Sequence, residues 1–170
     1  MTAGKTYVPI STANGTGSNS TITFSSIPST YTDLVLVFNG STTFTTGDYF
    51  NLKINNDTGS NYSNTVMVGN GSGIGSYRNS NQSFYDGQAW GWNTGQTVLT
   101  KIHFMNYSNT SNYKTFLTRW DNNTSGTSWA VAANVGLWRS TAAITSISIY
   151  SALGNITSTS MATLYGIAAA

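Results

Sequence analysis

The chain has 170 residues, a formal net charge of +2, only 7% charged residues and no cysteine. This length fits one domain with a substantial core. The missing thiols exclude disulfides, zinc–thiolate sites and a cysteine nucleophile, and the seven basic residues never cluster as a nucleic-acid patch requires. Abundant Thr, Ser, Tyr, Val and Ile, the lack of Glu and the lack of a helical heptad predict an all-β chain.

Residues 1–20 are expected to form an N-terminal arm and edge strand of a single domain that spans residues 1–170. Residues 1–5 lack the hydrophobic run of a signal peptide, and no later stretch approaches a membrane span in length. We therefore expect synthesis in a cytoplasm and no membrane partner. Residues 6–10 contain Pro9, which favours an edge strand. Residues 12–20 predict a loop, and residues 21–25 alternate polar and apolar as a half-buried strand does.

The most apolar stretch of the chain lies in residues 31–40, between a Pro-containing turn and an Asn-Gly pair. Five consecutive large apolar residues occupy its middle. A strand here places Leu34, Leu36 and Phe38 on one face and Val35 and Val37 on the other. Such a strand is typically buried on both faces. We therefore predict that it is a central strand of the fold.

The next third of the chain alternates turns and strands. Residues 42–47 predict a polar turn, residues 48–55 a strand and residues 55–61 a tight turn rich in Asn and Asp. Residues 62–68 predict a further strand. Residues 69–82 are rich in Gly, Ser and Asn and predict a long loop.

Residues 83–92 are dense in aromatic side chains and are compatible with a strand or a loop. Phe84, Tyr85, Trp90 and Trp92 stand together, with Asp86 and Gln88 between them. Flat rings with short polar groups are suited to stacking on sugars. They are also suited to a subunit interface or to the core, which is the favoured interpretation, because Tyr and Trp bury large areas at little entropic cost. Tyr85, Trp90 and Trp92 are therefore the glycan or interface candidates.

The C-terminal half predicts five more strands. Residues 96–107 and 113–120 are expected to pair as a hairpin, and residues 121–127 to form a turn. Residues 129–138 contain small side chains that suit close approach to another sheet, and the tryptophans at the two ends of this segment are expected in the core. Residues 142–150 and 161–167 complete a set of nine or ten strands. This spacing predicts an antiparallel β-sandwich, with a jelly roll as the simplest topology.

No segment carries an evident catalytic pattern. His103, the one histidine, lies in the middle of a predicted strand on the face of Lys101 and Met105, where a structural role is favoured over catalysis. The five aspartates fall mostly at turns. Residues 57–61 offer oxygen atoms around a glycine, as calcium loops do, but turn chemistry accounts for them better. We therefore predict no enzyme, no metal and no cofactor.

Four segments stand out together over nearly the full length of the chain. They are residues 27–36 (IPSTYTDLVL), 61–65 (NYSNT), 138–147 (WRSTAAITSI) and 163–167 (TLYGI). These segments resemble a family of tailed-bacteriophage virion proteins that is common in phages of marine bacteria. The resemblance implies a β-sandwich that occurs alone or appended to tail and fibre proteins, and it implies no active-site residues.

A chain that holds only this domain, with no fibre shaft, looks like a capsid decoration or cement protein. The resemblance then implies location in the virion, contact with the major capsid protein and self-association, with a homotrimer expected on local threefold axes. The alternative is a tail fibre or tail-associated adhesion module that binds a host surface glycan through Tyr85, Trp90 and Trp92.

Overall fold

The computed structural model describes residues 6–87, 92–123 and 130–168, and these residues form twelve β-strands. The strands are β1 (Tyr7–Asn14), β2 (Thr21–Phe24), β3 (Asp33–Gly40), β4 (Phe50–Ile54), β5 (Tyr62–Gly69), β6 (Ile74–Gln82), β7 (Tyr85–Asp86), β8 (Thr97–Phe104), β9 (Lys114–Asn123), β10 (Val131–Trp138), β11 (Ile147–Ser151) and β12 (Met161–Ile167). Over these ranges the chain has no helix with the length and apolarity that crossing a membrane requires.

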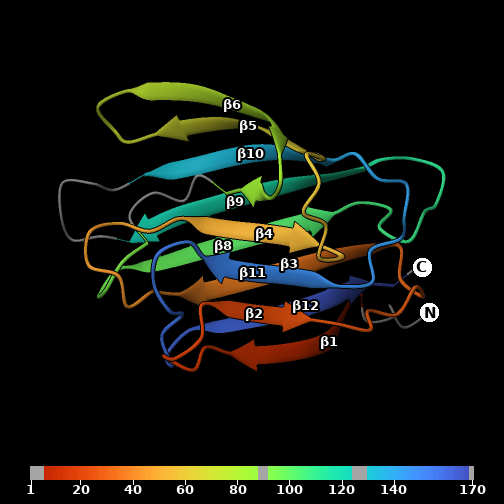
Figure 1. The fold of residues 1–170 in the computed structure, drawn as a ribbon, viewed down its shortest axis with the longest axis horizontal. Coiled ribbons are helices and arrows are strands. Elements are labelled where there is room, and N and C mark those ends of the chain that lie inside the picture. The colour runs from red at the N-terminus through yellow and green to blue at the C-terminus, as the bar shows by residue number, and fades with distance from the viewer. Residues whose placement is uncertain (1–5, 88–91, 124–129, 169–170) are drawn as a thin grey trace.

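The strands pair into two antiparallel sheets. The large sheet has eight strands in the order β1-β12-β3-β8-β9-β10-β5-β6, and the small sheet has four in the order β2-β11-β4-β7. The small sheet lies across one face of the large one (Figure 1). The predicted all-β antiparallel sandwich is therefore confirmed. The jelly-roll topology stays a prediction, with which this strand order is consistent.

The core lies between the two sheets and is rich in aromatic rings. Phe38 of β3 and Phe50 of β4 have ring centroids 5.6 Å apart, and Tyr85 of β7 lies 4.7 Å from Phe116 of β9. The small residues of β10 make room for this packing, since a Cβ on Gly136 would lie 2.1 Å from the Phe116 ring. The glycine of this segment thus provides the close approach that its small side chains predict.

Strand β3 is an interior strand between β12 and β8, as the sequence predicts. Its side chains Leu34, Leu36 and Phe38 are fully buried against the small sheet. On the opposite face Val35 is 1% exposed, and its neighbours in register are a tyrosine of β12 and the histidine of β8. Val37 is half-buried. Burial on both faces is therefore confirmed for most of the strand.

Strand β6 corrects the sequence analysis, which assigned residues 69–82 to a loop. Residues 74–82 instead pair with β5 along nearly its whole length, from Gly69 opposite Ile74 to Tyr62 opposite Gln82. The strand is the last of the large sheet and is exposed or half-buried throughout. A strand with solvent on both faces has no apolar alternation, so its Gly, Ser and Asn content resembled that of a loop.

Smaller differences concern strand ends. The edge strand predicted at residues 6–10 is confirmed as β1, but it continues past a bulge after Pro9 into the predicted loop. Strand β11 occupies only the second half of the predicted segment 142–150, and β9 runs into the predicted turn 121–127, of which residues 124–127 lie outside the described residues. The hairpin of β8 and β9 is confirmed.

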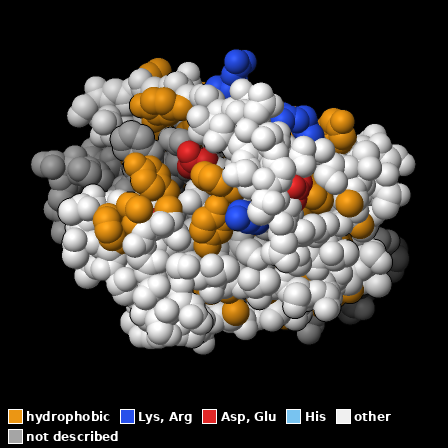
Figure 2. Space-filling view, viewed as in Figure 1, with side chains coloured by type: hydrophobic (Ala, Val, Ile, Leu, Met, Phe, Trp, Pro, Cys, Tyr) orange, Lys and Arg blue, Asp and Glu red, His pale blue; other side chains and the backbone are white. Residues whose placement is uncertain are grey.

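The two outer faces of the sandwich differ in composition. Figure 2 looks onto the side that carries the small sheet, where most of the visible surface is neither apolar nor charged and charged groups stand apart from one another. The outer face of the large sheet, across β8, β9, β10 and β5, has no further layer of described residues over it. We call this surface the open face.

Candidate functional site

The aromatic candidates from the sequence lie mainly inside the protein. Tyr85 is 1% exposed and Trp92 is fully buried, while Trp90 falls outside the described residues. Trp92 packs edge-on against Phe38 at 5.4 Å and beside Phe50 at 5.7 Å, and its Nε1–H donates to the last carbonyl of β3 at 3.1 Å. Neither described ring is open to a sugar, so the core interpretation fits both.

Tyr85 belongs to a buried polar seam that fastens β7 to the large sheet. Its hydroxyl donates to Thr118 Oγ1 at 2.9 Å. Asn64 and Asn134 of the large sheet donate their amide N–H groups to the carbonyls of residues 86 and 87, each at 2.8 Å. Burial raises the pKa of Tyr85 to about 12, against the hydrogen bonds that act to lower it. The seam is structural, because its donors point at protein acceptors.

Asp48 carries a buried carboxylate that organises the turn after β11. It is 1% exposed. Its oxygens accept the backbone N–H of residue 49 at 2.7 Å and those of residues 152, 153 and 154 at 3.0, 3.0 and 3.1 Å. They also accept a short hydrogen bond from the Ser151 hydroxyl. This carboxylate acts as a backbone cap, the role that the sequence analysis assigned to aspartates at turns.

His103 is paired with Asp33 on the outer side of the large sheet. Its Nε2 lies 2.8 Å from Asp33 Oδ2, and Asp33 Oδ1 accepts the backbone N–H of Asn106 at 2.7 Å. A catalytic triad would also need a hydroxyl nucleophile bonded to the ring. Among the described residues no such hydroxyl is hydrogen-bonded to His103. The geometry favours the structural role predicted for this histidine.

Asp57 is held by nitrogen donors. Gly59 N–H donates to Oδ1 at 2.8 Å, and Asn61 Nδ2 and Trp138 Nε1 donate to Oδ2 at 2.8 and 2.7 Å. Burial acts to raise the Asp57 pKa, but these three hydrogen bonds outweigh it and lower the pKa below its ordinary value. The described ranges contain no group of three or more His, Asp or Glu side chains that could hold a metal. Turn chemistry accounts for these residues.

Lys114 is a cation on the buried side of β9. It is 2% exposed, and its Nζ donates to the carbonyls of Asn112 at 2.8 Å and Thr141 at 3.1 Å. Burial lowers its pKa. The ammonium group therefore ties the loop before β9 to the segment after β10 through two of its three N–H donors.

The open face presents large aliphatic side chains to solvent. They lie on four adjacent strands: Leu99 of β8 (45% exposed), Leu117 of β9 (48%), Val131 (58%) and Val135 (52%) of β10, and Met67 of β5 (68%). Leu117 lies directly opposite Val135 across β9 and β10. Side chains opposite one another on neighbouring strands are about 5 Å apart, so Leu117 and Val135 are neighbours. Leu99 lies opposite Asp121 and Met67 opposite Ala133, so the patch has other residues between its large aliphatic members.

The same patch carries two cations side by side. Lys101 of β8 and Arg119 of β9 are directly opposite each other in the register. Like charges in this arrangement destabilise a sheet. Lys101 Nζ lies 5.8 Å from the Tyr7 ring, whereas Arg119 has no hydrogen-bond or ion-pair partner within the described residues. The one acid nearby is Asp121, two residues further along β9 on the same face.

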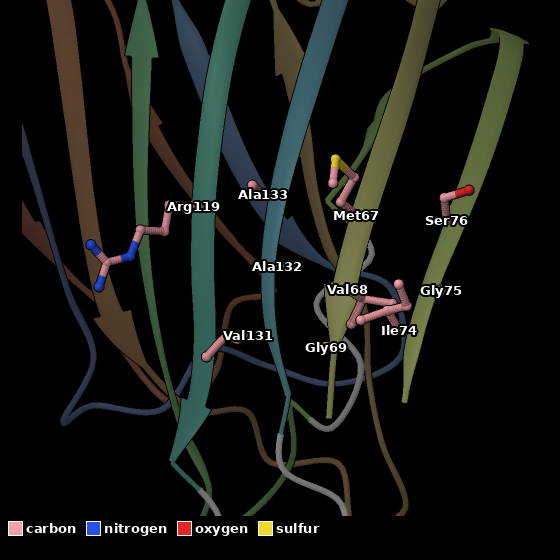
Figure 3. A pocket seen from close by; sticks show the side chains of 10 residues that line it. All are labelled: Met67, Val68, Gly69, Ile74, Gly75, Ser76, Arg119, Val131, Ala132 and Ala133. Atoms are coloured by element: carbon pink, nitrogen blue, oxygen red, sulfur yellow. The ribbon is translucent and has the colours of Figure 1, made fainter. Parts of the chain in front are cut away.

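A hollow of about 610 Å³ opens at one end of this face (Figure 3). Its walls include Met67, Ile74 and Val131, and the stem of Arg119 borders it from β9. The hollow exists because Gly69 has no side chain, and the position its Cβ would take has no neighbour within 4 Å. Ile74 at its rim is 96% exposed. The hollow is an apolar receptacle, and the guanidinium group of Arg119 points away from it (Figure 3).

Sequence reasoning did not identify the open face. One signal was present, because β10 places the larger Val131 and Val135 at alternate positions and the smaller or polar Ala132, Asn134 and Gly136 between them. The small set faces the core and the large set faces solvent. Valines that alternate with small core residues indicate a strand with an apolar outer face.

Comparison with family models, with curated proteins and with solved structures found no match to this chain.

Proposed function

We propose that the protein is a non-enzymatic structural protein of a bacteriophage virion, a capsid decoration or cement protein that binds neighbouring subunits of the shell. The observation that carries this proposal is the open face. It exposes five large aliphatic side chains on one side of the sheet, and large exposed apolar patches usually mark interaction surfaces. A broad, gently twisted sheet face is suited to lying on the surface of a shell.

The edges of the large sheet support self-association in the same assembly. Strands β1 and β6 end the sheet and leave one row of backbone groups unpaired. Exposed edges of this kind are sites where further chains can pair. In a homotrimer, neighbouring copies would cover the edges and leave the open face free for the major capsid protein.

The described titratable groups agree with a role without catalysis. Asp48 and Asp57 accept hydrogen bonds from backbone or side-chain N–H groups. His103 and Asp33 bind each other. The proposal requires no metal and no cofactor, because binding to a shell depends on surface complementarity alone.

The alternative, a tail-associated module that binds a host glycan, has less support. Its platform depended on Tyr85, Trp90 and Trp92, and the two described members of this set are buried. A glycan site would therefore need other side chains than those that suggested it.

Copy number in purified virions tests the proposal. A decoration protein repeats with the shell lattice and should be present at on the order of hundreds of copies per particle, whereas a tail component should be present at roughly a few to a few dozen. Quantitative mass spectrometry against the major capsid protein separates these outcomes. Absence from the particle, or a tail-like copy number, would overturn the decoration proposal.

A further inference from the structure

We propose that the open face binds an acidic protein surface that inserts one apolar side chain into the hollow beside Gly69 and places carboxylates over Lys101 and Arg119. This inference rests on the proposed function, for which it names the contact surface and the chemistry of the shell subunit. It commits to a protein different from this chain.

The charge distribution of the chain argues for carboxylates on the partner. Lys101 and Arg119 lie opposite each other without an intervening acid, an arrangement that costs stability in the free protein. Arg119 has no ion-pair partner among the described residues. Carboxylates from a partner would relieve the repulsion between the two cations and satisfy the guanidinium group in a water-poor interface.

The hollow argues for an apolar anchor. Binding energy at protein interfaces concentrates in a few side chains that fill pockets near the centre, surrounded by contacts that exclude water. Here Met67 and Val131 form walls, and the missing side chain of Gly69 leaves the space between them. A Leu, Met or Phe side chain from the partner is the group that fits such walls.

The distance between the two features sets the spacing on the partner. The hollow lies over β10, β5 and β6, and the cations belong to β9 and β8, which are two and three strands from β5, the strand of Gly69. Figure 3 shows the Arg119 side chain extending away from the hollow. Strands are about 4.8 Å apart, so the partner's carboxylates should stand roughly 10 to 15 Å from its apolar anchor.

A second copy of this chain does not supply that chemistry. Of its five aspartates, Asp48 is buried, Asp33 is bound to His103 and Asp57 is held by three N–H donors. Asp86 accepts a hydrogen bond from Asn79, so Asp121 is left, and it belongs to the open face itself. Two open faces brought together would carry four cations, Lys101 and Arg119 of each copy, against two carboxylates, Asp121 of each copy.

A peptide titration tests the surface chemistry independently of any virion. The probe is an acetylated, amidated peptide with a central leucine and aspartates three and four residues to either side, and its control replaces every aspartate by asparagine. Three to four extended residues span about 10 to 14 Å. Amide chemical shifts of the labelled full-length protein should move at Met67, Ile74, Arg119 and Val131 with the acidic peptide only. Equal responses to both peptides, no response, or shifts elsewhere would overturn the proposal.

Two variants test the same surface in the particle. Gly69→Val places a branched side chain in the hollow, and the open space at this position should let the protein fold normally. Arg119→Gln removes the charge. Each should lower the binding of the protein to particles that lack it by at least about tenfold. The matched controls on the small-sheet side are Thr21→Val and Lys53→Gln, which should bind as the wild type does.

The outcomes separate this inference from the proposed function. If both variants are present in the virion at the copy number of the wild type, the open face is not the surface that contacts the shell, while the decoration role stays intact. Absence of the wild-type protein from the virion would overturn the decoration role, and the peptide titration would still decide on the face. Sedimentation that shows an oligomer dissociated by Gly69→Val would overturn the acidic partner in favour of a second copy.

Discussion

The inner and outer faces of the large sheet are built from the same strands but treat their cations in opposite ways. On the inner side of β9, the ammonium group of Lys114 donates to two carbonyls. On the outer side of the same strand, Arg119 has no partner among the described residues and lies opposite Lys101. The cation on the inner face is therefore bound within the protein, whereas the cation on the outer face is open to a partner.

This difference indicates which residues stabilise the fold and which remain available for binding. Residues of the inner face, such as Trp92 and Phe38, contact one another and set the stability of the fold. Residues of the outer face, such as Leu117 and Val135, remain about half exposed and contribute less to folding. Substitutions on the two faces should therefore have different consequences, and these consequences can be measured.

The largest expected effect is on the inner side. Trp92→Ala removes a fully buried ring that packs against Phe38 and Phe50. We expect a loss of about 3–5 kcal/mol in the free energy of unfolding, measured by urea denaturation. Leu117→Ala on the open face is the control, with an expected loss below about 1 kcal/mol. Similar losses for both variants would show that the two faces contribute equally to the free energy of unfolding.

Removal of the buried carboxylate at residue 48 should rank next. Asp48→Ala leaves several backbone N–H groups without an acceptor in a buried turn. Each unsatisfied donor costs about 1–3 kcal/mol, although water can reach part of the turn, so we expect a total of about 3 kcal/mol. Thermal unfolding measures it. Asp121→Ala on the open face should change stability by no more than about 0.5 kcal/mol. A loss as large as that of Asp48→Ala would contradict the difference between the buried turn and the open face.

The buried tyrosines predict a fall in stability at alkaline pH. Burial raises the pKa values of Tyr85 and Tyr150 to about 12, above the ordinary value of 10.0. Between pH 10 and 12 the unfolded chain releases phenolic protons that the folded chain retains, so stability falls as pH rises. Tyr85 alone should account for about 1–2 kcal/mol by pH 12.

Tyr85→Phe isolates this contribution. The variant should be less stable than the wild type at pH 7, because Thr118 loses its partner. Urea denaturation at a series of pH values should show that this variant loses less stability between pH 10 and 12 than the wild type does. An unchanged slope would mean that Tyr85 titrates in the folded protein as it does in the unfolded chain.

The sequence predicted the inner face better than the outer one. Alternation in residues 96–107 and 113–120 and the apolar run around Leu36 were sufficient to place the hairpin and the central strand, because burial against a second sheet imposes a period of two. Strand β6 has solvent on both sides and left no such pattern. Its pairing with β5 depends on the whole sheet and is not encoded locally.

The candidate site could not be predicted for a related reason. Apolar residues are usually assigned to the core, but β10 places Val131 and Val135 outside and Asn134 and Gly136 inside. Gly136 makes room for a phenylalanine ring, and Asn134 caps a carbonyl of the segment after β7. Both reasons involve residues far away in the sequence. The aromatic residues Tyr85 and Trp92 were noticed for their chemistry, yet their positions are set by the packing of the two sheets.

The smallest expected effect is that of replacing Arg119. It tests the difference between the two faces most directly, because this variant should gain stability whereas the others should lose it. Arg119→Thr replaces a charge that lies opposite Lys101 by a residue with high strand propensity. Loss of the like-charge contact should raise the free energy of unfolding by about 0.2–1 kcal/mol, measured by urea denaturation at low salt. The gain should shrink as salt screens the repulsion.

Arg139→Thr is the matched control, because this arginine is engaged within the protein. Its guanidinium donates to Ser63 Oγ and to Asn81 Oδ1, each at 2.8 Å. That variant should lose about 1 kcal/mol. A loss of the same size for Arg119→Thr would show that Arg119 has a structural role and would remove the charge argument for an acidic partner. A gain in stability together with weaker binding to the particle would mean that the open face keeps a cation at a cost to folding, which is the expected mark of a binding residue.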